Sequence, residues 1–225
     1  MTPRIGLDLE PGLLISRVLA DLDLLDVAYG ATHGGVQSLL APLSAFASGT
    51  PYSAEHFFLP GLPLLIVKAE PEQQDRVLGL GNAPDRVLLT GARGHALTDL
   101  DHVVEFVKKV GGFAQEIGVL IEPEAAALRE LSRARAQWAF FSSEPLFRAA
   151  SQTEAEAEIA HLTSAAAAAD KLNLRVALHG PTGRHLPAAF RNIPRLEEVY
   201  PTPDLWNLAL RLGWERAVAE YCSLL

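Results

Sequence analysis

The chain has 225 residues, of which 49% are hydrophobic and 20% charged, and this composition excludes a disordered chain. The 19 Lys and Arg residues against 27 Asp and Glu give a net charge of −8, and no basic block favours a nucleic-acid surface. The single cysteine, Cys222, excludes a disulfide scaffold and fits a reducing cytoplasm. No apolar run approaches the roughly 18 residues of a membrane span. The first four residues are not followed by a long apolar run, so no signal peptide is expected.

Short apolar runs alternate with longer helical stretches in the first half of the chain. Continuous apolar runs are typical of strands buried on both faces, and a period of 3.6 residues is typical of helices. These patterns predict strands at 4–9, 26–32, 62–69 and 86–90, and helices at 13–24, 36–43 and 71–80.

The second half continues the alternation. Thr98 with Asp101, and Thr153 with Glu156, resemble capping boxes at the starts of helices. In chain order, we expect a helix at 98–110, a strand at 117–121, a helix from Glu122, a strand at 138–141, a helix at 153–172, strands at 175–178 and 196–200, and a helix at 204–221.

Two segments allow either internal packing or a contact surface. Residues 44–61 are irregular and carry three phenylalanines, so they form either a loop packed on the fold or a contact between copies of the chain. The expected last helix carries aromatic residues close to one face, which pack on the fold or form an exposed partner surface. These aromatic residues are Trp206, Trp214 and Tyr221.

Eight strand–helix alternations predict a parallel sheet, and its simplest closed form is a (β/α)8 TIM barrel of the α/β class. An open doubly wound sheet is the rival, but no Gly-x-Gly-x-x-Gly follows the first strand. No linker or shift in composition divides the chain, so we expect one domain over residues 1–225.

The C-terminal half resembles pyridoxine 5′-phosphate synthase, the barrel enzyme of vitamin B6 synthesis. Leu172-Asn173-Leu174-Arg175-Val176 is similar to the family's Leu-Gly-Leu-Lys-Val before strand seven. Asn192-Ile193-Pro194 to Glu198 is similar to its Ile-Pro-x-x-x-Glu before strand eight, and residues 213–221 are similar to its closing helix. The resemblance implies a TIM barrel that forms a homo-oligomer.

The family's functional positions carry different residues here. Its acid/base Glu of strand three falls on Lys68, and its Glu and His of strand six fall on Phe140 and Ser142. Its Gly-His-Gly of strand seven falls on His179-Gly180-Pro181, and its phosphate loop of strand eight falls on Tyr200-Pro201-Thr202-Pro203. Phosphate loops bind with backbone N–H groups, which prolines lack, so synthesis of pyridoxine phosphate is not expected.

Active sites of such barrels lie at the carboxyl ends of the strands, where this sequence places polar residues of both charge signs. The catalytic candidates are Lys68, Glu122, His179 and Glu10. The candidates for ligand binding are Asp8, His33, Ser142, Ser143 and Thr202.

Several candidates have a structural alternative. Lys68 is either a desolvated nucleophile with a depressed pKa or the cation of an ion pair with Glu70, Glu122 or Asp8. Glu122 is either a general base or a carboxylate at a helix start, and His179 is either a site residue or a structural histidine. The Gly91–His95 loop either receives a phosphate or is a solvated turn.

Three functions remain open. The first is a divergent barrel that binds a small phosphorylated or anionic metabolite, with or without changed chemistry. The second is a non-catalytic scaffold or pseudoenzyme, and the third is the family's synthase reaction. The histidines are scattered without metal-ligand spacing, so no metal is expected, and no cofactor, nucleic acid or membrane partner is expected either.

Overall fold

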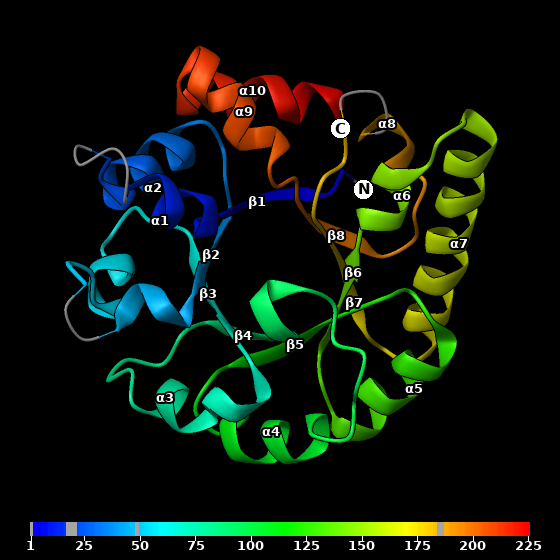
Figure 1. Ribbon diagram of the computed structural model, residues 1–225, viewed down its shortest axis with the longest axis horizontal. Coiled ribbons are helices and arrows are strands. Elements are labelled where there is room, and N and C mark those ends of the chain that lie inside the picture. The colour runs from blue at the N-terminus through cyan, green and yellow to red at the C-terminus, as the bar shows by residue number, and fades with distance from the viewer. Residues whose placement is uncertain (1, 17–21, 48–49, 184–186) are drawn as a thin grey trace.

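A computed structural model describes residues 2–16, 22–47, 50–183 and 187–225 of the chain. Its parallel strands pair in sequence order, and β8 pairs with β1, so the sheet closes into a barrel (Figure 1). The strands are β1 (Arg4–Asp8), β2 (Ser38–Pro42), β3 (Leu64–Ala69), β4 (Arg86–Leu89), β5 (Glu116–Ile121), β6 (Trp138–Ser142), β7 (Arg175–His179) and β8 (Leu196–Tyr200). The predicted (β/α)8 TIM barrel is confirmed.

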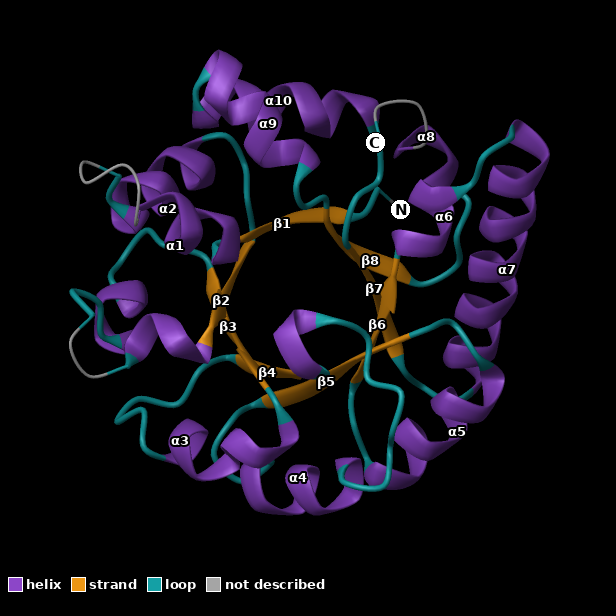
Figure 2. Ribbon diagram, in the orientation of Figure 1, coloured by secondary structure: helices purple, strands orange, loops and turns teal. Residues whose placement is uncertain are grey.

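Helices surround the barrel on its outer side (Figure 2). They are α1 (Glu10–Ser16), α2 (Leu24–His33), α3 (Gln74–Leu78), α4 (Val103–Val110), α5 (Ala125–Ala134), α6 (Glu144–Arg148), α7 (Gln152–Lys171), α8 (Pro187–Phe190), α9 (Asp204–Leu212) and α10 (Trp214–Leu224). Short 3₁₀ turns add η1 (Leu43–Phe46), η2 (Ala54–Phe58), η3 (Pro71–Gln73) and η4 (Ala92–Gly94). Over the described part of the chain, no helix has the length and apolar character needed to cross a membrane.

The second strand lies later in the chain than the sequence predicts. Residues 26–32 belong to helix α2, and the expected helix at 36–43 is instead occupied by strand β2. Asp23 starts α2 by accepting a hydrogen bond from the Leu25 N–H, and the helix buries residues spaced three and four apart. Every residue of β2 is buried, which a five-residue strand achieves inside a barrel. Both runs are short and apolar, so periodicity alone could not separate them.

Three helix boundaries also differ from expectation. Helix α4 begins at Val103, without the expected capping box at Thr98. Helix α7 is capped by Ser151, whose hydroxyl accepts from the Glu154 N–H at 3.2 Å, and not by Thr153. The expected last helix is two helices, because Gly213 adopts a φ of +79° between α9 and α10.

The two segments with open alternatives contain well-packed residues. Phe57 is buried in the 44–61 segment and packs edge-on against Phe46, with ring centroids 5.8 Å apart. Residues 48 and 49 of that segment lie outside the described part. Trp206 and Tyr221 are buried, and the rings of Trp206 and Trp214 meet edge-to-face at 4.6 Å, so these aromatic residues pack internally.

Aromatic side chains fill the barrel interior. A Cβ atom on Gly6 would lie 2.1 Å from the ring of Tyr200, and one on Gly118 would lie 2.8 Å from the ring of Phe140. The two glycines therefore leave the space that the two rings occupy. The Tyr200 hydroxyl bonds to Ser38 at 2.7 Å and donates to Glu198 at 2.7 Å, and burial beside that carboxylate raises its pKa well above the usual value.

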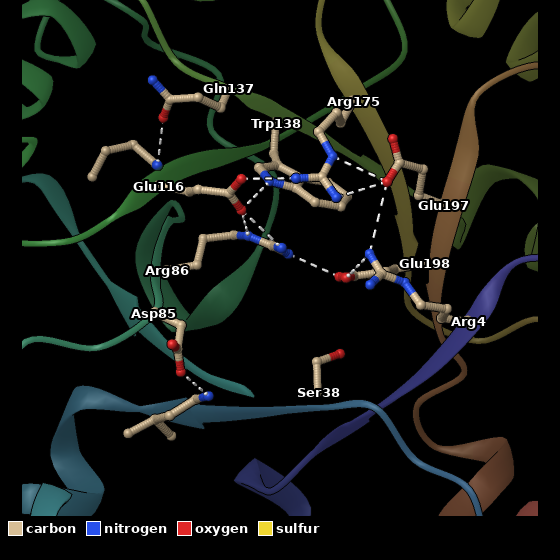
Figure 3. Close-up of polar contacts among 12 residues, drawn as sticks. Arg4, Ser38, Asp85, Arg86, Glu116, Gln137, Trp138, Arg175, Glu197 and Glu198 are labelled. Carbon is tan, nitrogen blue, oxygen red and sulfur yellow. Dashed lines mark hydrogen bonds and ion pairs between the residues drawn. The ribbon is translucent and has the colours of Figure 1, made fainter. Parts of the chain in front are cut away.

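An ion cluster lies at the amino-terminal ends of the strands (Figure 3). Arg86 bridges Glu116 and Glu198, and Arg4 and Arg175 complete the cluster through Glu198 and Glu116. Because parallel strands begin at the same edge, these residues of β1, β4, β5, β7 and β8 meet beneath the aromatic interior. The cluster lies at the end of the barrel opposite the carboxyl ends of the strands, which we call the mouth.

Candidate active site

Three polar side chains from separate strands meet at the carboxyl end of the barrel. Lys68 of β3 donates to both carboxylate oxygens of Asp8 at the end of β1, at 2.8 and 3.1 Å. His179, at the end of β7, lies with its Nε2 3.0 Å from Asp8 Oδ2. We call these three residues the charge group. Asp8 and Lys68 are buried, so their ion pair is shielded from water and is not a surface ion pair.

The charges of Asp8 and Lys68 stabilise each other. Burial by itself would raise the pKa of Asp8, but Lys68 and His179 outweigh it and hold the pKa well below its usual range. Burial would likewise lower the pKa of Lys68, but Asp8 and Glu10 raise it above the usual value. Lys68 is therefore a fixed cation. The ion pair with Asp8 is present, and the depressed pKa needed for a lysine nucleophile is absent.

Glu10 adds a second carboxylate to the group. It is the first residue of α1, its N–H donates to Asp8 Oδ1 at 3.0 Å, and its carboxylate accepts a hydrogen bond from Lys68. Its side chain is 38% exposed, so it is the member of the group that reaches solvent.

A cavity of about 420 Å³ lies above this group, and we call it the mouth cavity. Its lining includes Asp8, Glu10, Arg93, Ser142, His179 and Thr202. Its volume falls within the ~300–1,000 Å³ typical of small-molecule sites. A smaller cavity of about 180 Å³ adjoins it beside Lys68, with Glu10, Arg93 and Gly94 lining both. The aromatic interior therefore closes the barrel below the site but leaves the mouth open.

The loop after β4 covers part of the mouth cavity. Its one-turn helix η4 lies across the barrel opening (Figure 2). The Arg93 N–H donates to Glu70 at 3.1 Å, and the Leu97 N–H donates to the Leu120 carbonyl at 2.7 Å, which holds the loop at both ends. Gly94 has a φ of +75°, and a Cβ there would lie 3.3 Å from Glu10. The sequence predicts either a phosphate loop or a solvated turn here, and the structure places Arg93, Gly94 and His95 of this loop in the lining of the mouth cavity.

The remaining candidates divide between the mouth and other places. Ser142 and Thr202 line the mouth cavity. Ser143 is buried behind it, where its hydroxyl donates to the Pro181 carbonyl at 2.8 Å. Ser143 thus holds the loop after β7 rather than facing the cavity.

Glu122 and His33 lie away from the charge group. Glu122 lines a separate groove of about 640 Å³ between residues 97–100 and α5, where burial and Glu144 raise its pKa. The predicted position of His33 at a strand end is wrong, because His33 lies in the last turn of α2. Because that turn leads into the start of β2, His33 is at the opposite end of the barrel from the mouth.

Within residues 2–16, 22–47, 50–183 and 187–225, no group of three or more His, Cys, Asp or Glu side chains is arranged to hold a metal ion. Asp8 and Glu10 instead share the ammonium group of Lys68.

Solved structures resemble the chain in fold. A putative fructose-1,6-biphosphate aldolase from Coccidioides immitis matches with a TM-score of 0.64 and 11% identity, over 99% of this chain and 91% of that one. Thiamine phosphate pyrophosphorylase from Pyrococcus furiosus matches with a TM-score of 0.60 and 10% identity, over 99% and 95% of the two chains. Identities this low show a shared barrel fold and no more. The comparison with curated proteins gave no match.

A family model gives the evidence for descent. The model for "Pyridoxal phosphate biosynthesis protein PdxJ" matches residues 84–225, from just before β4 to the C-terminus. The match includes His179 of the charge group, while Asp8, Glu10 and Lys68 precede it. It spans well over half of the 225 residues. The chain belongs to the PdxJ family of pyridoxal phosphate biosynthesis proteins.

Proposed function

We propose that the chain is a divergent PdxJ-family barrel that binds a small polar metabolite in the mouth cavity and transfers protons to and from it. The observation that carries this proposal is the 3.0 Å contact between His179 Nε2 and Asp8 Oδ2 beneath that cavity. A histidine oriented by a buried carboxylate is a common arrangement for general acid–base catalysis.

Each member of the charge group has a role in this proposal. Asp8 accepts a hydrogen bond from the Nε2–H of His179. This leaves Nδ1 as the nitrogen that exchanges a proton with the ligand. Lys68 keeps Asp8 ionised despite its burial, so it acts as a positioning residue. The hydroxyls of Ser142 and Thr202 supply hydrogen bonds to the oxygens of the ligand.

The family's synthase reaction is less well supported by the residues of the mouth. The resemblance aligns the family's acid/base Glu of strand three with Lys68, which is here a buried cation between two carboxylates. It also aligns the phosphate loop with Pro201 and Pro203, which have no N–H to donate. We therefore propose changed chemistry rather than synthesis of pyridoxine phosphate.

Ligand-observed NMR with small unphosphorylated hydroxy-carbonyl compounds tests the proposal. Hydroxyacetone in D₂O is a suitable probe, since proton transfer at its α-carbon replaces hydrogen by deuterium. We expect exchange with the wild-type protein and at least a hundredfold slower exchange in His179→Gln and Asp8→Asn.

The matched control is His33→Gln, because His33 lies at the far end of the barrel. It should leave both binding and exchange unchanged. Absence of any bound hydroxy-carbonyl compound in the mouth cavity, or equal exchange in His179→Gln, would contradict the proposal. Formation of pyridoxine phosphate from the family's phosphorylated sugar and aminoketone would instead establish the synthase reaction.

We also propose a cytoplasmic homo-oligomer. The single free cysteine, Cys222, suits a reducing compartment. Leu14, Phe147 and Leu210 are large apolar side chains that are about 60% exposed or more, which suits contacts between copies of the chain. Light scattering that reports a monomer would refute the oligomer.

A further inference from the structure

We propose that Asp204 closes one wall of the mouth cavity to phosphate, and that the metabolite carries no phosphate group at that wall. We call residues 180–183, which are the described part of the loop after β7, and residues 201–203, the loop after β8, the β7–β8 wall. Gly180, Pro181, Thr202 and Pro203 of this wall line the mouth cavity. The statement about the metabolite rests on the proposed function, whereas the closed wall can be tested on its own.

The position of this wall gives Asp204 its significance. TIM barrels frequently bind phosphate with the loops after strands seven and eight and the start of the following helix. Such sites hold the anion with unpaired backbone N–H groups. Whether a barrel can accept phosphate there therefore depends on how many N–H groups the two loops leave free.

The β7–β8 wall has no such donor to offer. Pro181, Pro201 and Pro203 have no N–H group. The N–H groups of Gly180 and Thr202 both donate to the carbonyl of Tyr200, at 3.1 and 2.8 Å. These bonds tie the start of each loop back to the end of strand β8.

The remaining two donors of the wall bind Asp204. Its Oδ2 accepts from the Thr182 N–H at 2.6 Å, from the Gly183 N–H at 3.0 Å and from the Thr182 hydroxyl at 3.1 Å. Asp204 is the first residue of α9, so its negative charge also lies at the positive end of that helix. One carboxylate of the chain thus occupies the two backbone donors of the wall that are not already paired with Tyr200.

The neighbouring contacts hold this arrangement in place. Thr182 is buried, and its hydroxyl also bonds to the hydroxyl of Tyr221 on α10. Ser143 holds the same loop through the Pro181 carbonyl. A phosphate could bind the Thr182 and Gly183 N–H groups only by displacing the Asp204 carboxylate that accepts from them, which makes Asp204 a specificity-determining residue.

The polar groups left in the cavity suit a different ligand. The Ser142 and Thr202 hydroxyls and the His179 imidazole bond well to hydroxyl and carbonyl oxygens. Asp8, Glu10 and Glu144 add three carboxylates to the lining, against the guanidinium of Arg93 and the imidazole of His95. This lining favours an unphosphorylated hydroxy-carbonyl compound over a sugar phosphate.

Inorganic phosphate is the probe for a direct test. We would titrate it into the wild-type protein, Asp204→Ala and the matched control Asp23→Ala, follow ³¹P line widths, and solve phosphate-soaked crystals. Asp23 is also an aspartate at a helix start, where its carboxylate accepts the Leu25 N–H. We expect a phosphate ion on the Thr182 and Gly183 N–H groups in Asp204→Ala only, with affinity at least about tenfold above wild type.

Asp204→Asn covers the case in which Asp204→Ala does not fold. It removes the charge but keeps an acceptor oxygen, so its phosphate affinity should rise by a smaller factor. Phosphate on those N–H groups in the wild-type protein, or no gain in any folded Asp204 variant, would overturn the inference. Either result leaves proton exchange by His179 intact, whereas an exchange-inactive wild type with a phosphate-binding Asp204→Ala would refute only the proposed function.

Discussion

The guanidinium carbon of Arg86 lies 3.6 Å from the ring centroid of Trp138, at the end of the barrel opposite the mouth. Arg175 lies 4.0 Å from the same centroid, and the indole N–H donates to Glu116 at 2.7 Å. Two cations thus contact one aromatic ring whose polar edge binds the carboxylate they share. The arrangement stabilises a partly buried ion cluster at the amino-terminal end of the barrel.

Arg86→Leu should destabilise the fold strongly. Arg86 and Glu198 are both almost fully buried, and they pair at 2.8 Å. Removing the cation leaves the buried carboxylate with Arg4, a partly exposed side chain, as its remaining cation, which should cost up to about 3–5 kcal/mol of unfolding free energy. Urea denaturation measures the loss.

Arg133→Leu is the matched control, because Arg133 forms an exposed pair with Glu130. It should change stability by less than about 1 kcal/mol. Equal effects of the two substitutions would contradict a buried role for Arg86.

Gly6→Ala should also destabilise the barrel, through crowding rather than charge. The added Cβ would lie 2.1 Å from the Tyr200 ring, and the ring is fixed by hydrogen bonds to Ser38 and Glu198. Overpacking of this kind costs about 1–3 kcal/mol. Gly112→Ala is the matched control, because it adds the same atom where no heavy atom lies within 4 Å. Thermal unfolding of both variants should show a lower melting temperature for Gly6→Ala and almost no change for Gly112→Ala.

The start of α7 gives a local test. Ser151→Ala removes the hydroxyl that accepts the Glu154 N–H and should cost about 1 kcal/mol. Thr153→Ala, at the residue that the sequence pattern suggested as the cap, lies inside the helix and should have no such cost. A larger loss of unfolding free energy in Thr153→Ala would contradict the observed cap.

Much of the fold could be predicted because its signal is local. Strands such as β3 and β5 are buried on both faces, so they appear in the sequence as continuous apolar runs. The position of β2 could not be predicted, because the apolar runs at 26–32 and 36–43 are both too short for periodicity to separate strand from helix. The break at Gly213 has no signal in the apolar spacing, which continues across it, and only the backbone turn separates α9 from α10.

The site could be predicted only where it lies directly at strand ends. Asp8, Lys68 and His179 end strands, so the topology of a parallel barrel brings them together. The roles of Arg93 and Asp204 depend on the conformations of the loops after β4 and β7. No spacing rule in one sequence supplies that information.

The loss of unfolding free energy caused by Lys68→Met, relative to the wild type, should depend on pH. In the wild type, the pKa of Asp8 is below its ordinary 3.8 and that of Lys68 is above its ordinary 10.5. The stabilising contribution of Asp8 is therefore present above 3.8 and lost as the pH falls. That of Lys68 is present below 10.5 and lost as the pH rises through the raised pKa.

Without the ammonium group, only the contact with His179 opposes the effect of burial at Asp8, so the pKa of Asp8 rises from its wild-type value and the deficit of the variant shrinks as Asp8 binds a proton. We expect a deficit of about 3–5 kcal/mol at pH 7, measured by urea denaturation, that shrinks toward pH 5. Lys109→Met, which removes an exposed pair with Asp75, should show a small deficit that is the same at both pH values. A deficit in Lys68→Met that does not change with pH would show that Asp8 does not depend on Lys68 for its charge.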